Sequence, residues 1–138
     1  MDEASITQYI TDTFDGVDVV SASGGTFFFY NPERKFPFVT LTTNDEYDQF
    51  SNLSRAGVFR LNIGVSKQTF QSLFPAGDTG QDFTALDRIM PHPVYGKMYW
   101  VCVLNPSEAT FQAVRPLLAE AYDLAVHKHA KRAAREET

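Results

Sequence analysis

The chain has 138 residues, of which 43% are hydrophobic and 21% charged, and these proportions are typical of a globular protein and exclude a disordered one. Its formal net charge of −5 argues against a general affinity for nucleic acid or anionic membrane, because phosphate binding requires a surplus of Lys and Arg on the contacting face. A chain of this length buries about two-thirds of its unfolded surface. We therefore expect residues 1–138 to form one domain, with a frayed basic end on its last helix.

Cysteine usage and the amino-terminus indicate the compartment. The single cysteine, Cys102, cannot form an internal disulfide and lies in the apolar run 99–104, which predicts a buried strand. Met1 is followed by two acidic residues, the wrong sign for a signal peptide, and no stretch approaches the roughly 18 apolar residues of a membrane span. These features predict a cytoplasmic protein with no membrane association.

The first part of the chain predicts a helix and a three-stranded meander. Apolar residues at helical spacing favour a helix over residues 3–14, closed by Gly16. Residues 17–21 and 26–30 flank a Ser-Gly-Gly break and predict a hairpin. A proline-containing turn then leads to a third strand over residues 36–43. The polar stretch that follows permits one short helical turn at most.

The middle of the chain alternates strand and short-helix signals. Residues 58–63 alternate between one face with Val58, Arg60 and Asn62 and another with Phe59, Leu61 and Ile63, which predicts an amphipathic strand. Ser66 is a suitable cap for a short helix that ends before Pro75. Residues 82–90 permit a second short helix, followed by an extended Pro91-His92-Pro93 segment.

The carboxyl-terminal part predicts a central strand and a long helix. Residues 98–104 are almost wholly apolar, as a central strand requires. Asn105, Pro106 and Glu108 have the order of an N-cap, a first-position proline and an acidic residue three after the cap. Pro116 is expected to kink or split the helix. The whole order predicts an α+β fold, with an antiparallel sheet and helices mainly on one face.

Patterns for catalysis, metal binding and nucleotide binding are missing from the sequence. There is no Gly-x-Ser-x-Gly, Walker A or dinucleotide-binding pattern, and the His and Cys residues are not at ligand spacing. Burial in an apolar strand raises the pKa of a thiol such as Cys102 and makes it unreactive. We therefore expect no catalytic residue, no metal and no cofactor, and interpret the chain as a non-enzymatic binding or regulatory module.

The loop around His92 is the leading hypothesis for a partner surface. Pro91 and Pro93 fix the backbone of His92, and we expect Tyr95 and Asp87 to lie near it. Function tends to lie on such loops when a rigid scaffold positions them. The expected partner is a protein or a small molecule.

Two alternatives remain open. Arg34 and Lys35 at a hairpin tip could act with the basic end of the last helix as a weak DNA-binding surface, although the net acidic charge disfavours DNA. The helix residues of that surface are Lys128, Lys131 and Arg132. A pocket on the open face of the sheet would instead bind a small molecule or a substrate, and its expected lining is Phe27 or Phe29, Tyr30 and Trp100.

Several motifs resemble known bacterial families. The segment from Lys97 to Arg132, with its aromatic-Trp strand, the Ala121-Tyr122-x-Leu124 pattern and a basic tail, resembles the C-terminal half of MmcQ/YjbR-like proteins. Pro-His-Pro-x-Tyr-Gly at 91–96 and Trp-Val-x-Val-Leu-Asn-Pro at 100–106 resemble a bacterial family of unknown function more closely still. The resemblance implies a CyaY-like α+β fold, sometimes proposed to bind DNA, without an established enzyme activity. Ala121 stands where the usual Ser-Tyr pair has serine.

Overall fold

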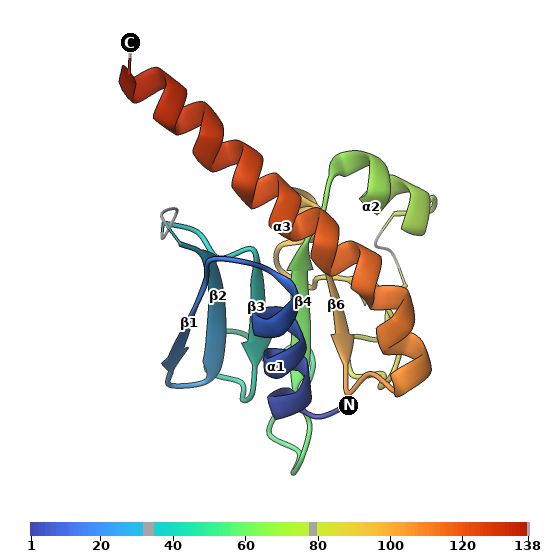
Figure 1. The fold of residues 1–138 in the computed structure, drawn as a ribbon. Helices are drawn as coiled ribbons and strands as arrows, with labels where there is room; N and C mark the ends of the chain where they lie inside the picture. Colours follow the sequence, from blue (N-terminus) through green and yellow to red (C-terminus); the bar gives the residue numbers. More distant parts are fainter. Residues whose placement is uncertain (32–34, 78–79, 138) are drawn as a thin grey trace.

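A computed structural model describes residues 1–31, 35–77 and 80–137, with the side chains of residues 136 and 137 excepted. This part of the chain forms three α-helices and one six-stranded sheet, whose arrangement can be followed in Figure 1. The helices are α1 (Glu3–Thr13), α2 (Lys67–Leu73) and α3 (Glu108–Glu137), with a 3-10 helix, η1, at Gly96–Met98. The strands are β1 (Val17–Ala22), β2 (Gly25–Tyr30), β3 (Val39–Thr42), β4 (Arg60–Gly64), β5 (Met90–Pro91) and β6 (Trp100–Leu104).

The sheet is antiparallel throughout, in the order β1-β2-β3-β4-β6-β5. Helices α1 and α3 lie across the same face of it (Figure 1). The main core fills the space between, where Ile6 and Ile10 of α1 and Val114 and Leu118 of α3 are fully buried. The α+β fold class and the one-sided placement of helices are therefore confirmed.

Alternation along β4 and β6 creates a second, smaller interior on the opposite face of the sheet. Leu61 and Ile63 belong to the core beneath the helices, so Arg60 and Asn62 point to the other face. This face is closed by loop 43–59, between β3 and β4, and by the segment that leads into β5. A small apolar cluster lies there, formed by Leu53, Met90, Cys102 and Leu104.

The N-cap residue of α3 differs from the sequence prediction. Ser107, and not Asn105, is the N-cap, since the Ser107 hydroxyl accepts from the backbone N–H of Thr110. Asn105 has φ +43° and its side chain accepts from the N–H of Phe59 instead. The predicted split at Pro116 is also wrong, because α3 runs unbroken from Glu108 to Glu137. Buried residues on both sides of Pro116 hold the helix on the sheet, and a proline removes only one intrahelical hydrogen bond.

Two short helices permitted by the sequence are absent from the described residues. Between residues 82 and 90, the Asp82 carboxylate accepts from the N–H of Thr84, and Met90 pairs with β6, so the segment forms a turn and a strand. In loop 43–59, Asn44 and Asp45 accept from backbone N–H groups of Glu46 and Leu53. Such side-chain acceptors compete with helical hydrogen bonds and favour turns.

The packing of Trp100 on Gly64 gives a test of the sheet register. These residues pair across β4 and β6, and a Cβ on Gly64 would lie 2.9 Å from Cε2 of Trp100. Gly64→Ala should therefore displace the indole, cost about 1–3 kcal/mol of unfolding free energy and shift the emission of the only tryptophan. Urea unfolding and fluorescence measure both effects.

Gly57→Ala is the matched control for this substitution. Gly57 has φ +74° with open space around its Cα, so alanine there introduces backbone strain only. We expect a loss of about 1 kcal/mol with unchanged tryptophan emission. An emission shift of equal size in both variants would contradict the proposed contact.

Candidate functional site

A buried arginine organises the face of the sheet that carries no helices. Arg60 lies on the central strand β4 with only 1% of its surface exposed. Burying a charge costs several kcal/mol unless the charge is paired and its donors are satisfied. The surrounding residues must therefore supply an anion and several acceptors.

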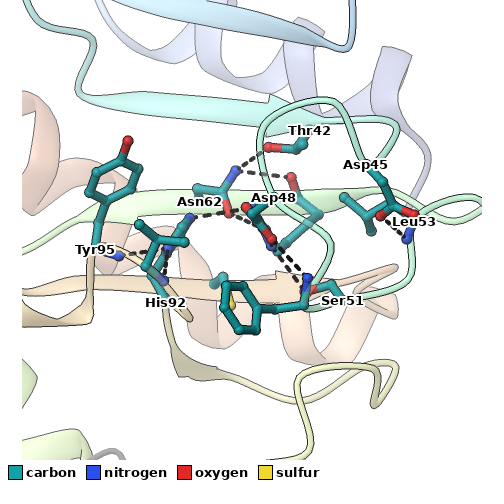
Figure 2. Close-up of polar contacts among 12 residues, drawn as sticks. Thr42, Asp45, Asp48, Ser51, Leu53, Asn62, His92 and Tyr95 are labelled. Carbon is teal, nitrogen blue, oxygen red and sulfur yellow. Dashed lines mark hydrogen bonds and ion pairs between the residues drawn. The ribbon is translucent and has the colours of Figure 1, made fainter.

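Loop 43–59 supplies the anion. Arg60 donates from Nη1 and Nη2 to the two carboxylate oxygens of Asp48, at 3.0 and 2.7 Å, and from Nη1 to Oγ of Ser51 at 3.0 Å. Burial alone would raise the pKa of Asp48, but the hydrogen bonds and charge of Arg60 hold this pKa below its ordinary value. Figure 2 shows Asp48 and Ser51 reaching from the loop towards the sheet. This bidentate pair anchors the loop.

Asn62 extends the network across the sheet. Its Oδ1 accepts from Nε of Arg60 at 2.8 Å, and its Nδ2 donates to the hydroxyl oxygens of Thr42 and Thr40 at 2.8 and 3.0 Å. All buried side-chain nitrogen and oxygen atoms that the structure describes have a hydrogen-bond partner. The polar part of this interior, beside the apolar cluster of Leu53, Met90, Cys102 and Leu104, thus has all its hydrogen bonds satisfied.

His92 completes the cluster from the β5 side. Its Nδ1 accepts from the backbone N–H groups of Val94 and Tyr95, at 3.0 and 2.9 Å, which assigns the ring proton to Nε2. Nε2 lies 3.4 Å from Nη2 of Arg60. Burial, followed by the charge of Arg60, lowers the pKa of His92 to about 3, so the imidazole is neutral. We call Arg60, Asp48, Ser51, Asn62 and His92 the Arg60 network.

The chemistry of this network is structural. The lone pair of Nδ1 is occupied by backbone donors, and His92 is only 4% exposed. Burial raises the pKa of the neighbouring Cys102 thiol to about 12, which removes its nucleophilicity. Within the described residues, no group of three His, Cys, Asp or Glu side chains could hold a metal ion.

The predicted partner surface is only partly assembled. The rings of His92 and Tyr95 lie together, with centroids 5.1 Å apart, and Tyr95 is 52% exposed. Asp87 is placed at the other end of β6, where its N–H donates to Leu104 and its carboxylate accepts from the N–H of Ser107 at 2.7 Å. A partner at this surface would therefore contact Tyr95 and not the imidazole.

The two basic segments that the sequence considered together do meet in the fold. The ammonium groups of Lys35 and Lys128 each lie 5.6 Å from the centroid of the Phe36 ring. Arg34 lies outside the described residues. Lys131 and Arg132 line the same concavity as Lys128.

That concavity is a groove of about 610 Å³ between the second half of α3 and the ends of β4 and β6. We call it the basic groove. Its apolar lining comprises Phe36, Pro37, Phe38, Val65, Met98, Trp100, Ala121, Leu124 and Ala125, and Gly64 and His127 also contribute. Its cations are Lys128, Lys131, Arg132 and Arg135. No Asp or Glu is among the lining residues that the structure describes. Phe27, Phe29 and Tyr30, expected to line a pocket with Trp100, do not belong to it.

The fold and the sequence define the class of protein. Residues 1–134 match DUF6194, a family of unknown function, and the chain belongs to this family. A crystal structure of a protein from Pseudomonas syringae, a structural-genomics target, has a similar fold, with a TM-score of 0.59 over 91% of this chain and 99% of that one, at 13% sequence identity. No curated protein matches the sequence. None of the described helices is long and apolar enough to cross a bilayer.

Removing the buried cation should destabilise the fold strongly. Arg60→Met leaves Asp48 without its partner in a site that is almost closed to water, and losing one partner of a buried pair costs about 3–5 kcal/mol. Urea unfolding should show this loss. The exposed Arg88→Met variant should stay within about 0.5 kcal/mol of the parent. Equal stability of the two variants would contradict a structural role for Arg60.

The burial of neutral His92 predicts a loss of stability in acid. Its pKa is about 3 in the folded protein and near 6.5 in the unfolded chain, so between these values only the unfolded chain binds the proton. The neutral state of His92 therefore contributes to the free energy of unfolding in full above pH 6.5, and this contribution falls towards pH 3 by up to about 1.4 kcal/mol per pH unit.

His92→Asn isolates this term, because an Asn oxygen can accept the same backbone N–H groups without titrating. Denaturant unfolding between pH 6 and pH 4 should show a slope reduced by about one proton relative to the parent. An unchanged slope in His92→Asn would show that His92 takes up no proton on unfolding.

Proposed function

We propose that this protein is a non-enzymatic binding module, and that its ligand is an anion with an apolar part that occupies the basic groove. The observation that carries the proposal is the composition of the groove. Four of the twelve Lys and Arg residues line one concavity with an apolar floor, in a chain with net charge −5. A groove of about 610 Å³ is within the size range of ligand sites, roughly 300–1,000 Å³.

The cations are arranged along the groove. Residues 128, 131, 132 and 135 follow the i, i+3, i+4, i+7 spacing, which places them on one face of α3. Interaction with the helix dipole explains cations only in the last turn, and residues 128–132 precede it. Lys128 is also held over the Phe36 ring, which positions its ammonium beside apolar surface. An anionic group with an apolar neighbour fits this combination.

The titratable groups elsewhere support binding over catalysis. His92 is neutral and engaged by backbone donors, and Cys102 is buried with a raised pKa. In the groove, Nδ1 of His127 lies 2.8 Å from the Asp123 carbonyl oxygen, to which it donates. These groups are committed to structure.

Three further parts of the proposal come from the sequence. Tyr95, which is 52% exposed, offers a second contact surface and precedes the 3-10 helix that carries the groove residue Met98. The thiol of Cys102 suits a reducing cytoplasm. The segment from Lys97 to Arg132 suits a relationship to MmcQ/YjbR-like proteins of CyaY-like fold.

The anionic aromatic dye 8-anilinonaphthalene-1-sulfonate tests the proposed function. We expect saturable fluorescence enhancement that weakens with added salt, and about fivefold to tenfold weaker binding in Lys128→Gln/Lys131→Gln, because each exposed ion pair contributes up to about 1 kcal/mol. Lys67→Gln/Arg88→Gln removes the same charge from exposed positions outside the groove and should bind like the parent. Equal weakening in both variants would contradict the proposal.

A further inference from the structure

We propose that the natural occupant of the basic groove is an acidic, amphipathic peptide segment of a partner protein. This inference rests on the proposed function, since it names the class of ligand for the same groove. Three features of the groove support this inference. Its cations follow the axis of α3, its floor has exposed aliphatic side chains, and its aromatic rings already contact other groups of the protein.

The cations form a line and not a cluster around one point. From Lys128 to Arg135 the helix rises by about 10 Å, so the positive charges follow the axis of α3. In Figure 1 the carboxyl-terminal part of α3 extends past the edge of the sheet. An elongated ligand with several spaced anionic groups matches this line better than a compact ligand with a single anionic group.

The floor of the groove offers anchoring positions for apolar side chains. Met98 is 67% exposed and Leu124 of α3 is 43% exposed. An amphipathic helix docks such a surface through apolar residues spaced at i, i+3, i+4 and i+7, while its polar face meets the rim. Methionine suits peptide recognition because its flexible side chain adapts to irregular partners.

The aromatic rings of the groove are poorly placed for nucleic acid bases. Binding of single strands depends on bases that stack on open ring faces. The ring of Phe36 already contacts the ammonium groups of Lys35 and Lys128. Trp100 packs so closely on Gly64 that a Cβ there would lie 2.9 Å from the indole. The charge and apolar complementarity of the groove therefore favours a peptide.

Fluorescence anisotropy with three labelled probes tests the inference on the full chain. The first probe is an amphipathic peptide of about 15 residues with Leu and Phe on one helical face and Glu on the other. The second is a scrambled peptide of the same composition, and the third is oligo(dT) of about 15 nucleotides. We expect the amphipathic peptide to bind at least about tenfold more tightly than either comparator.

Two variants locate the contact. Met98→Gln should weaken binding of the amphipathic peptide about fivefold through loss of an apolar anchor, and Lys128→Gln/Lys131→Gln should weaken it further. Leu86→Gln, at an exposed position outside the groove, should bind like the parent.

Each remaining outcome distinguishes this inference from the proposed function. Equal affinity for the two peptides, or tighter binding of oligo(dT), would overturn the inference. The proposed function would still stand if the lysine variant lost dye binding in the parallel titration. Failure of both the dye and the peptide to bind in a lysine-dependent way would overturn the two together.

Discussion

The burial of Arg60 on the central strand β4 is the constraint on which the outer face of this protein depends. A guanidinium that is 1% exposed requires a carboxylate and further acceptors, and these come from loop 43–59 and from Asn62 of β4 itself. Such a pair contributes little net stability over an apolar isostere, because desolvation offsets its attraction. Its effect here is to fix which loop residues face the sheet.

The same network positions the surroundings of the basic groove. His92 accepts from Val94 and Tyr95 and so sets the turn that leads through η1 to Met98. The N–H of His92 also bonds the carbonyl of Trp100, at the groove end of β6. The buried Arg60 network therefore holds in place the loop 92–99 and the end of β6, which supply Met98 and Trp100 to the floor of the basic groove. Rigid support of this kind reduces the ordering cost of binding.

Sequence patterns predicted the elements better than the site. Alternation of side chains predicted β4. The pairing of Arg60 with Asp48 and Ser51 was not predicted, because both residues lie in a polar stretch that is typical of a solvated loop. A charged residue at an inward position of the clearest strand was the available signal. Helical spacing predicts that the basic residues of α3 lie on one face. The approach of Lys35 and Phe36 to Lys128 of α3 depends instead on tertiary contacts that no local pattern encodes.

The distribution of charge bears on selectivity. The chain has seventeen acidic and twelve basic residues, so its net negative charge repels a long polyanion. Four of the basic residues nevertheless lie together on one face of α3. At physiological salt, charges interact over only about 8 Å, so a ligand short enough to stay within the groove experiences mainly those cations. A long nucleic acid would extend over the acidic remainder of the surface. The segregation of charge therefore selects for short anionic ligands, and the apolar floor selects among these for amphipathic ones.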